Sequence, residues 1–254
     1  MTNQEIQPAL TACLQELHLP TMRSQFQALA QQAQQESLSY ESYLLELAER
    51  ECQQRRHNRT ERLLKESRLP LEKNLQTFDL KRLPAKVVQQ VRTLLTGEFV
   101  RRQENVLLFG PPGSGKTHCC CALAQELVRA GQRVLFTTCS LLVQDLLVAK
   151  RDLTLKALLR RLANWDVVLI DDLGYVQQSR EEMEVLFTLL AERYEMGSVM
   201  VTSNLAFSKW DQVFKDPMTT AAAIDRLVHH CTIVELNVPS YRVETAKKAQ
   251  KGSS

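Results

Sequence analysis

Residues 110–117 have the sequence Gly-Pro-Pro-Gly-Ser-Gly-Lys-Thr, and this stretch decides the fold. It matches the pattern of a phosphate-binding loop in full, with an apolar run before it and a helical pattern after it. Glycines let the backbone curl so that successive N–H groups face phosphate oxygens, and the following helix offers its positive end to the same anion. Lys116 adds a charge for the β- and γ-phosphates, and the Thr117 hydroxyl is a magnesium ligand. The residues expected to bind a nucleotide are Gly110, Pro111, Pro112, Gly113, Ser114, Gly115, Lys116 and Thr117.

Five short apolar runs, one before the loop and four after it, predict the strands of a sheet. Each is β-branched or leucine-rich, which is typical of strands covered on both faces in a parallel sheet. Helical patterns follow the first four runs, and Ser179 with Glu182 forms a capping box that opens a helix toward Glu195. This alternation predicts a doubly wound α/β domain. The expected strands are Asn105–Phe109, Arg133–Thr137, Asp166–Ile170, Ser198–Thr202 and Thr232–Leu236.

Polar residues follow the third and fourth runs, at the sheet edge where α/β proteins bind their ligands. We expect Asp171 to hold magnesium and Asp172 to orient or activate the attacking water. Asn204 could bridge that water and the γ-phosphate. The alternative for the two carboxylates is a strand-ending turn before Gly174, and for Asn204 it is a simple Ser-Asn turn.

An arginine late in the chain is a further candidate for the chemistry. Arg226 stands between Asp225 and Leu227, after a helix-forming run over residues 219–224. An arginine in this position could reach the γ-phosphate of a neighbouring subunit and stabilise charge in the transition state. The alternative is a local surface pair between Asp225 and Arg226.

The first 67 residues contain no glycine and have a helical pattern. Apolar residues at helical spacing predict a long helix over Ser39–Ser67. From Arg50 to Arg68 this segment has seven positive and three negative side chains, a net charge of +4. Such a face can bind DNA phosphates or simply be solvated. The candidate DNA-binding residues here are Arg55, Arg56, Arg59 and Arg62.

A second basic cluster lies between the second and third expected strands. Its residues could face a DNA backbone, where charge neutralisation gives affinity with little sequence preference, or form the solvated ends of an amphipathic helix. The leucines that support a helix with one packed side are Leu153, Leu155, Leu158, Leu159 and Leu162. The basic candidates are Lys150, Arg151, Lys156, Arg160 and Arg161, and a third basic patch holds Lys247, Lys248 and Lys251.

The composition is that of an ordinary globular protein. The chain has 254 residues, 44% of them hydrophobic and 24% charged, and its net charge is only +3, so local clusters would have to meet a polyanion. The start of the chain is polar and no apolar stretch approaches the roughly 20 residues of a membrane span, so we expect a cytoplasmic protein without membrane contact. The seven cysteines lack zinc-site spacing, and we expect reduced thiols packed as small apolar groups.

Taken in order, these motifs resemble those of AAA+ ATPases of the initiator and helicase-loader branch. The chain is most similar to the IstB-type ATP-binding helpers of transposition, which are relatives of the DnaC helicase loader. The resemblance spans most of residues 100–245, and the basic helix followed by Phe78 and Asp79 also looks like the leading segment of the family. The stretches that carry it are residues 110–118, 169–175, 193–195, 202–204, 225–227 and 240–242, the last reading Ser-Tyr-Arg.

The resemblance implies a role for each matching residue. Lys116 and Thr117 match the Walker A lysine and magnesium ligand, Asp171 the Walker B aspartate, Asn204 the sensor 1 residue and Arg226 the arginine finger. His118 ends the loop motif of the family and joins the expected nucleotide-binding residues.

Two positions depart from the general AAA+ pattern. Asp172 occupies the place of the usual catalytic glutamate and is one methylene shorter, which implies slow hydrolysis, although related loaders and helpers share this Asp-Asp pair. Only 28 residues follow Arg226, too few for the usual helical lid, so we expect no C-terminal lid. Arg242 could then substitute for the sensor arginine of the lid.

The expected organisation is a helical DNA- or partner-binding domain over residues 1–68 and a linker or strap with the first ATPase helix over 69–102. The AAA+ domain, with a five-stranded parallel sheet, covers 103–246, and 247–254 form a basic tail. The resemblance implies ATP and Mg²⁺ as cofactors, with duplex DNA, a transposase and further copies of the chain as partners. An ATPase that oligomerises on duplex DNA and assists transposition is the expected function. A replicative helicase loader and an ATP-stabilised DNA scaffold with little hydrolysis are the alternatives.

Overall fold

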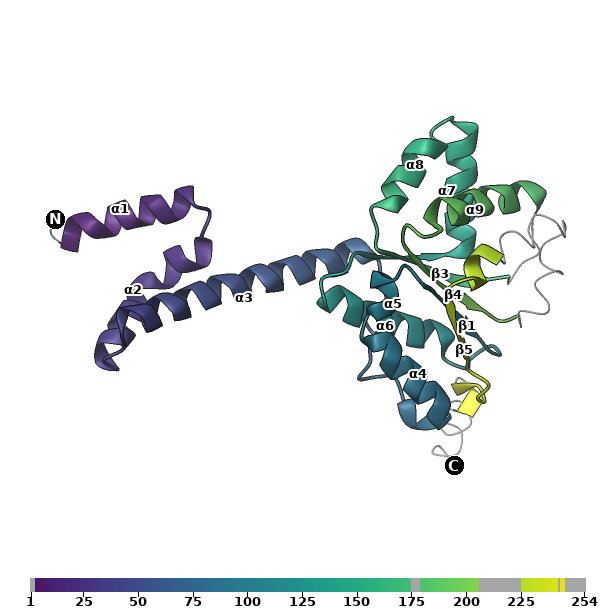
Figure 1. Cartoon of the computed structure of the whole chain (residues 1–254), viewed down its shortest axis with the longest axis horizontal. Helices are drawn as coiled ribbons and strands as arrows, with labels where there is room; N and C mark the ends of the chain where they lie inside the picture. The colour runs from purple at the N-terminus through teal and green to yellow at the C-terminus, as the bar shows by residue number, and fades with distance from the viewer. Residues whose placement is uncertain (1–2, 175–178, 206–224, 242, 245–254) are drawn as a thin grey trace, which may run out of the picture. The chain divides into compact units, whose positions relative to one another are not determined.

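The computed structural model describes residues 3–174, 179–205, 225–241 and 243–244 (Figure 1). The chain divides into two compact units, Met1–Arg62 and Leu63–Ser254, and the division falls within the long helix α3. Arg242, the helix-forming run before Arg226 and the basic tail lie outside the described residues. No helix of the described residues is long and apolar enough to cross a membrane.

The N-terminal unit is helical, as the sequence predicts. Its helices are α1 (Asn3–Glu16), α2 (Pro20–Gln35) and the first part of α3 (Tyr40–Ser67), which begins one residue after the predicted start. Its small apolar core consists of Leu14, Phe26, Leu29 and Leu47. The Tyr43 hydroxyl donates a hydrogen bond to the Phe26 carbonyl at 3.0 Å and so ties α3 to α2.

A carboxylate of α3 caps the N-terminus of α2. The amides of Thr21 and Met22 donate to Glu51 Oε2 at 2.8 and 3.0 Å, which satisfies two donors that a helix start leaves without partners. Arg55 donates to Glu51 Oε1 at 2.8 Å and also to the carbonyl of His18. Burial alone raises the pKa of Glu51, but these hydrogen bonds outweigh it and hold the pKa below its usual value. Arg55 therefore stabilises the unit itself.

The second unit contains the predicted five-stranded parallel sheet, with the strand order β2-β3-β4-β1-β5. This confirms the α/β fold class. The predicted strand limits agree with the structure to within one residue except at the end of the third strand, which runs three residues further. The strands are β1 (Asn105–Phe109), β2 (Val134–Thr138), β3 (Val167–Leu173), β4 (Ser198–Ser203) and β5 (Cys231–Glu235).

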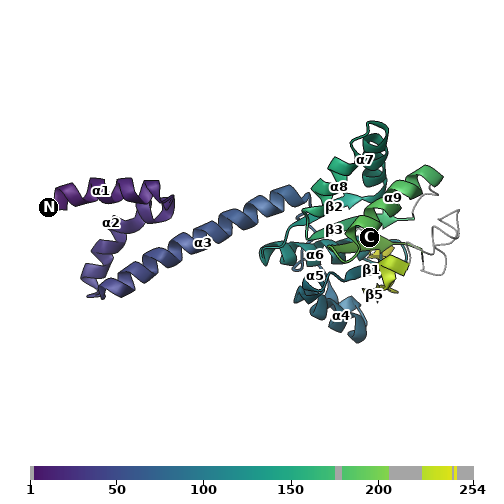
Figure 2. The same ribbon diagram turned by 45° about the horizontal axis from the view of Figure 1, so that its top comes forward.

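Helices cover both faces of the sheet (Figure 1 and, turned, Figure 2). The first face packs against α4 (Ala85–Leu95), α5 (Glu98–Arg101) and α6 (Lys116–Arg129). The second packs against α7 (Cys139–Arg151), α8 (Leu155–Ala163) and α9 (Arg180–Arg193). The predicted capping box of Ser179 and Glu182 begins α9. A short 3-10 helix, η1 (Leu80–Arg82), lies in the segment before α4.

The cysteine prediction is confirmed for the interior and wrong for two positions. None of the seven forms a disulfide bond, and Cys119, Cys120 and Cys121 are buried together because α6 is covered on several sides. Burial raises the pKa of Cys119 and Cys121 to about 12, so these thiols are neutral. Cys13 and Cys52, in contrast, are exposed on the N-terminal unit rather than packed.

One of the five leucines predicted on the packed side of the amphipathic helix lies outside that helix. Leu153 is 93% exposed and has a φ of 57°, in the turn between α7 and α8. A residue with this left-handed backbone angle cannot be part of a right-handed helix, so α8 starts only at Leu155. Leu162 is buried, and Leu155, Leu158 and Leu159 pack against the same core. The predicted amphipathic helix is thus present but shorter.

Candidate nucleotide site

The phosphate-binding loop lies between β1 and α6, at the carboxyl edge of the sheet. Gly113 and Gly115 have φ values of 78° and 96°, which favour glycine, and Gly115 is the residue before the first turn of α6. A side chain at Gly110 would meet the carbonyl oxygen of Leu236 at 2.5 Å. The loop therefore packs tightly against the C-terminal end of β5. A side chain would collide with that end at Gly110, and the backbone angles favour glycine at Gly113 and Gly115.

The Lys116 ammonium is held between the loop and the end of β4. Its Nζ donates to Asn204 Oδ1 at 2.6 Å and to the carbonyls of Gly110 and Pro111 at 2.9 and 3.1 Å. Lys116 is only 5% exposed, so these oxygens replace the water that the charge has lost. The two residues expected to meet the γ-phosphate, Lys116 and Asn204, are thus brought together.

Thr117 and Asp171 also meet, as a magnesium site requires. The Thr117 hydroxyl donates to Asp171 Oδ1 at 2.8 Å, and the Thr202 hydroxyl donates to the same oxygen at 2.5 Å. Thr202 in turn accepts a hydrogen bond from the backbone amide of Asp172 at 2.9 Å. Thr202 therefore positions both aspartates, a role that sequence reasoning did not assign to it.

The pair of aspartates lies in an irregular part of the sheet. The register between β3 and β4 shifts between Ile170 and Leu173, and Asp172 has a φ of 60°. Such irregularities redirect side chains and are common next to active sites. As a result Asp171 is buried while Asp172 is exposed and lines the pocket over the loop. The Asp-Asp stretch is neither a plain strand nor the strand-ending turn that was the alternative.

A pocket of about 620 Å³ lies over the loop and is closed on one side by the segment before α4. This size is in the range of small-molecule sites. Phe78 lies beside the His118 ring, with centroids 5.2 Å apart, and the His118 Nε2 lies 3.1 Å from both the Asn74 carbonyl and the Thr77 hydroxyl. The sequence suggested a strap here but not that it forms a wall of the pocket.

Ser240 and Tyr241, the described residues of the Ser-Tyr-Arg stretch, contact the loop. A side chain at Gly113 would lie 2.1 Å from Ser240 Oγ, and the Tyr241 amide donates to the Gly113 carbonyl at 3.0 Å. Arg82 of the strap lies over the Tyr241 ring, 5.0 Å from its centroid, and pairs with Glu244 at 2.9 Å. The C-terminal segment and the strap thus enclose the loop together.

A comparison with known families identifies the chain. A family model described as IstB-like ATP binding protein matches residues 12–249. The chain belongs to the IstB-like ATP-binding protein family. This confirms the resemblance seen in the motifs.

Members of the IstB-like family that resemble this chain are named for ATP binding in insertion sequences. One from Sinorhizobium fredii is 42% identical over 239 residues, which cover 94% of this chain and 80% of the relative. The IS21 ATP-binding protein of Pseudomonas aeruginosa is 37% identical, over 94% of this chain and 91% of that protein.

Solved structures with the same fold include a helicase loader and a replication initiator. The DnaC helicase loader has a TM-score of 0.56 at 19% identity and covers 65% of this chain and 96% of its own. DnaA bound to AMPPCP and single-stranded DNA has a TM-score of 0.57 at 18% identity, over 73% of this chain and 56% of that one. At such identities the likeness shows the fold alone.

In this IstB-like chain, Arg226 is not brought to the loop of its own subunit. It is exposed in the short helical stretch before β5, at the amino edge of the sheet, and is absent from the pocket lining. The loop follows β1 and so lies at the opposite, carboxyl edge. The five residues of β5 separate the two edges by about 16 Å.

The predicted DNA-binding residues differ in what they contact. Arg56 of α3 donates to the Cys52 carbonyl at 3.3 Å. In the second cluster Lys150 pairs with Glu184 at 3.0 Å and Arg151 with Asp152 at 2.9 Å. Among the described residues, no ion pair involves the three exposed basic side chains of α8. These are Lys156, Arg160 and Arg161, which lie opposite the leucine side of the helix.

Proposed function

We propose that this protein is a slow, Mg²⁺-dependent ATPase that assembles head to tail on duplex DNA and assists a partner transposase. The observation that carries the proposal is the placement of two half-sites at opposite edges of one sheet. The phosphate-binding loop, Asp171 and Asn204 meet at the carboxyl edge, while Arg226 is exposed at the amino edge.

The residues of the carboxyl edge fit a nucleotide triphosphate. Ser114 Oγ is buried and has no hydrogen-bond partner among the described residues, which suits a group that receives a phosphate oxygen. Lys116 would exchange its bonds to loop carbonyls for the β- and γ-phosphates. The base would lie against Phe78 and His118 of the pocket wall, where an aromatic face offers a stacking surface.

The donor set around Asp171 fits magnesium. The Thr117 hydroxyl and the Asp171 carboxylate are hard oxygen ligands, which Mg²⁺ prefers together with phosphate oxygens and water. When bound, the ion would neutralise charge on the phosphates. Thr202 would keep Asp171 oriented through its 2.5 Å hydrogen bond.

Asp172 is the residue of this chain that would orient or activate the attacking water. It lines the pocket, as does Asn204, which contacts Lys116. The aspartate is shorter than a glutamate by one methylene and stands on a backbone with a φ of 60°. Both features limit its reach, which favours slow hydrolysis.

Head-to-tail assembly follows from the separation of the half-sites. Since Arg226 lies about 16 Å from the loop edge across β5, it would complete the nucleotide site of the next subunit rather than its own. A contact between two different surfaces repeats, and it produces a ring or a spiral. Nucleotide would thus promote assembly, and loss of the γ-phosphate would loosen it.

The outer face of α8 is the surface we assign to DNA. Lys156, Arg160 and Arg161 are exposed there, and repetition of this basic face along a spiral would neutralise successive phosphates. On α3 we assign the same role to Arg56, Arg59 and Arg62, while Arg55 pairs with Glu51. Assistance to a transposase is supported by the names of the relatives, which place ATP-binding proteins in insertion sequences.

A mixing experiment tests the shared site. Lys116→Ala should abolish hydrolysis by disabling the loop, and Arg226→Ala should abolish it by removing the neighbour's arginine. In an equal mixture, about a quarter of random interfaces join an intact loop to an intact arginine. We therefore expect the mixture to recover about a quarter of the DNA-stimulated phosphate release of the unmodified protein. No recovery on mixing, with both variants folded and still able to bind duplex DNA, would contradict the proposal.

DNA binding is tested by charge reversal. Replacing Arg160 and Arg161 with glutamate should weaken duplex binding and flatten its dependence on salt. The control reverses Lys86 and Arg92, two exposed positive residues of α4 on the opposite face of the sheet. Preference for single-stranded DNA together with binding to a replicative helicase would instead support the loader alternative. Assembly without phosphate release would support the scaffold alternative.

A further inference from the structure

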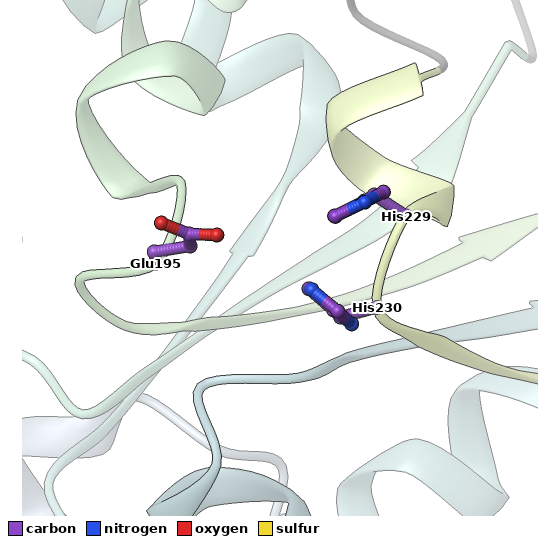
Figure 3. Close-up of side chains that lie close together, drawn as sticks. All are labelled: Glu195, His229 and His230. Atoms are coloured by element: carbon purple, nitrogen blue, oxygen red, sulfur yellow. The ribbon is translucent and has the colours of Figure 1, made fainter.

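The turns that begin β4 and β5 bring three potential metal ligands together. Glu195 comes from the turn after α9, and His229 and His230 come from the turn before β5 (Figure 3). One ligand atom from each side chain lies within 4.8 Å of the other two, and all three residues are exposed. Among the described residues, this is the group of three histidine, cysteine or acidic side chains close enough to share an ion.

The donor set points to a transition-metal ion. Two imidazole nitrogens and one carboxylate oxygen suit Zn²⁺, whereas Mg²⁺ prefers oxygen ligands only. Ligand atoms about 2.0–2.1 Å from a tetrahedral Zn²⁺ lie about 3.4 Å apart. The observed spread of up to 4.8 Å therefore has to close by at most about 1.4 Å, which small rotations of exposed side chains can provide.

The neighbouring residues hold one of the imidazoles as a metal site requires. The Tyr194 hydroxyl lies 3.0 Å from His229 Nδ1, so this ring nitrogen is engaged and Nε2 is left for an ion. Ligating histidines usually make such a bond through the second nitrogen, and it orients the ring. The His229 and His230 rings are 4.1 Å apart in an edge-to-face arrangement, which keeps both near the same point.

The two turns are also fixed to each other through the start of β1. Asn105 donates from its backbone amide to the His230 carbonyl at 2.8 Å and from its side chain to the Leu227 carbonyl at 3.2 Å. Its Oδ1 accepts a hydrogen bond from the Val199 amide at 2.9 Å. Asn105 thus joins the turn of the histidines to the first residues of β4. Glu195 itself has a φ of 56°, a rare backbone angle for a residue with a side chain, and such angles cluster at functional sites.

We propose that Glu195, His229 and His230 form a binding site for a divalent transition-metal ion, with Zn²⁺ as the ion that fits best. Three protein ligands leave one position of a tetrahedral ion open for water or another donor. His229 follows Arg226 by three residues, so the site lies on the surface that carries this arginine. Its existence does not depend on the role of Arg226, because the ion would bind a single, nucleotide-free chain.

Titration of the full-length, nucleotide-free protein with ZnCl₂ in a calorimeter tests the site. The unmodified chain should bind one equivalent that the double variant His229→Asn/His230→Asn loses. The matched control, His18→Asn/His57→Asn, removes two exposed histidines of the N-terminal unit and should keep that equivalent. All three proteins retain the exposed Cys13 and Cys52, so any binding by thiols is common to them.

Two single variants guard against a folding defect in the double variant. Glu195→Gln removes one exposed ligand, and Tyr194→Phe removes only the hydroxyl beside His229 Nδ1. Each should weaken Zn²⁺ binding about 10-fold or more while the circular dichroism spectrum stays unchanged. The proposal is overturned if the unmodified chain binds no Zn²⁺. It is equally overturned if folded Glu195→Gln and the double histidine variant bind the ion with unchanged stoichiometry and affinity.

Discussion

A buried arginine at the end of α9 offers the sharpest test of how the second unit, Leu63–Ser254, is held together. Arg193 is 3% exposed, and its guanidinium donates to the carbonyls of Leu162, Trp165, Asp166 and Ser198 at 2.9 to 3.3 Å. Burial lowers the pKa of Arg193 to about 10, against the opposing effect of the Asp166 charge. The side chain still carries its proton at neutral pH and joins α8, β3, α9 and β4.

The perturbation is Arg193→Met, which keeps the length of the side chain and removes all its donors. Three of the four carbonyls keep a backbone partner: Leu162 accepts from the Trp165 amide, Asp166 accepts from the Ser198 amide, and Ser198 itself is paired with β3 in the parallel ladder. These three lose a second, charged donor, whereas the Trp165 carbonyl loses Arg193 without another partner among the described residues, and a buried acceptor without its partner costs about 1–3 kcal/mol. Burying the charge of Arg193 has a solvation cost that is absent from the methionine variant. Allowing for this, we expect the free energy of unfolding to fall by about 3 kcal/mol.

Thermal unfolding measures this loss. For a unit of this size, about 3 kcal/mol corresponds to a fall in Tm of about 6–12 °C. Circular dichroism gives the transition, and tryptophan fluorescence reports on Trp165, whose carbonyl accepts from Arg193. The control is Arg92→Met, an exposed arginine of α4, which should change Tm by less than about 2 °C. If Arg193→Met and Arg92→Met shift Tm equally, the reasoning about the buried guanidinium is refuted.

Three further outcomes follow from individual contacts. Glu51→Gln should remove about 1 kcal/mol of protection from the amides at the start of α2 at pH 7, measured by hydrogen exchange, whereas Glu49→Gln at an exposed position should not. The pKa of Glu51 is held below its usual value of 4.5, so this stabilisation is present above pH 4.5 and is lost as the pH falls further. The Glu51→Gln variant should lack this dependence on pH. Thr202→Val should raise the Mg²⁺ concentration needed for half-maximal hydrolysis about 10-fold or more, and an unchanged requirement would show that Asp171 is oriented without it. Phe78→Ala should weaken ATP binding about 10-fold in calorimetry, and full affinity in this variant would remove the strap from the nucleotide pocket.

The fold was predictable because local and long-range signals agree in this chain. The loop at residues 110–117 requires a strand before it and a helix after it, and each of the five apolar runs forms a strand of the sheet. The end of β3 was harder to predict. Two adjacent carboxylates usually end a strand, but hydrogen bonds from Thr202 to Asp171 and from the Asp172 amide to Thr202 continue it through an irregular register.

What the sequence did not predict depends on contacts between distant segments. The strap has no periodic pattern, and its place beside the loop follows from contacts such as those of His118 with Asn74 and Thr77. Arg193 is an arginine in a helical segment, and arginines are rarely buried, so composition favours an exposed side chain. Only the four carbonyls from three separate elements explain its burial.

The parallel sheet itself explains why one chain cannot complete the proposed site. In a parallel sheet every strand points the same way, so residues that follow strands collect at one edge and residues that precede them collect at the other. Lys116 and Asn204 follow strands and Asp171 lies near the carboxyl end of β3, whereas Arg226 precedes β5. No side-chain rotation crosses the sheet, because even an extended arginine is much shorter than the length of β5. Cooperation between the two edges therefore demands a second subunit, and the requirement arises from strand direction rather than from any single contact.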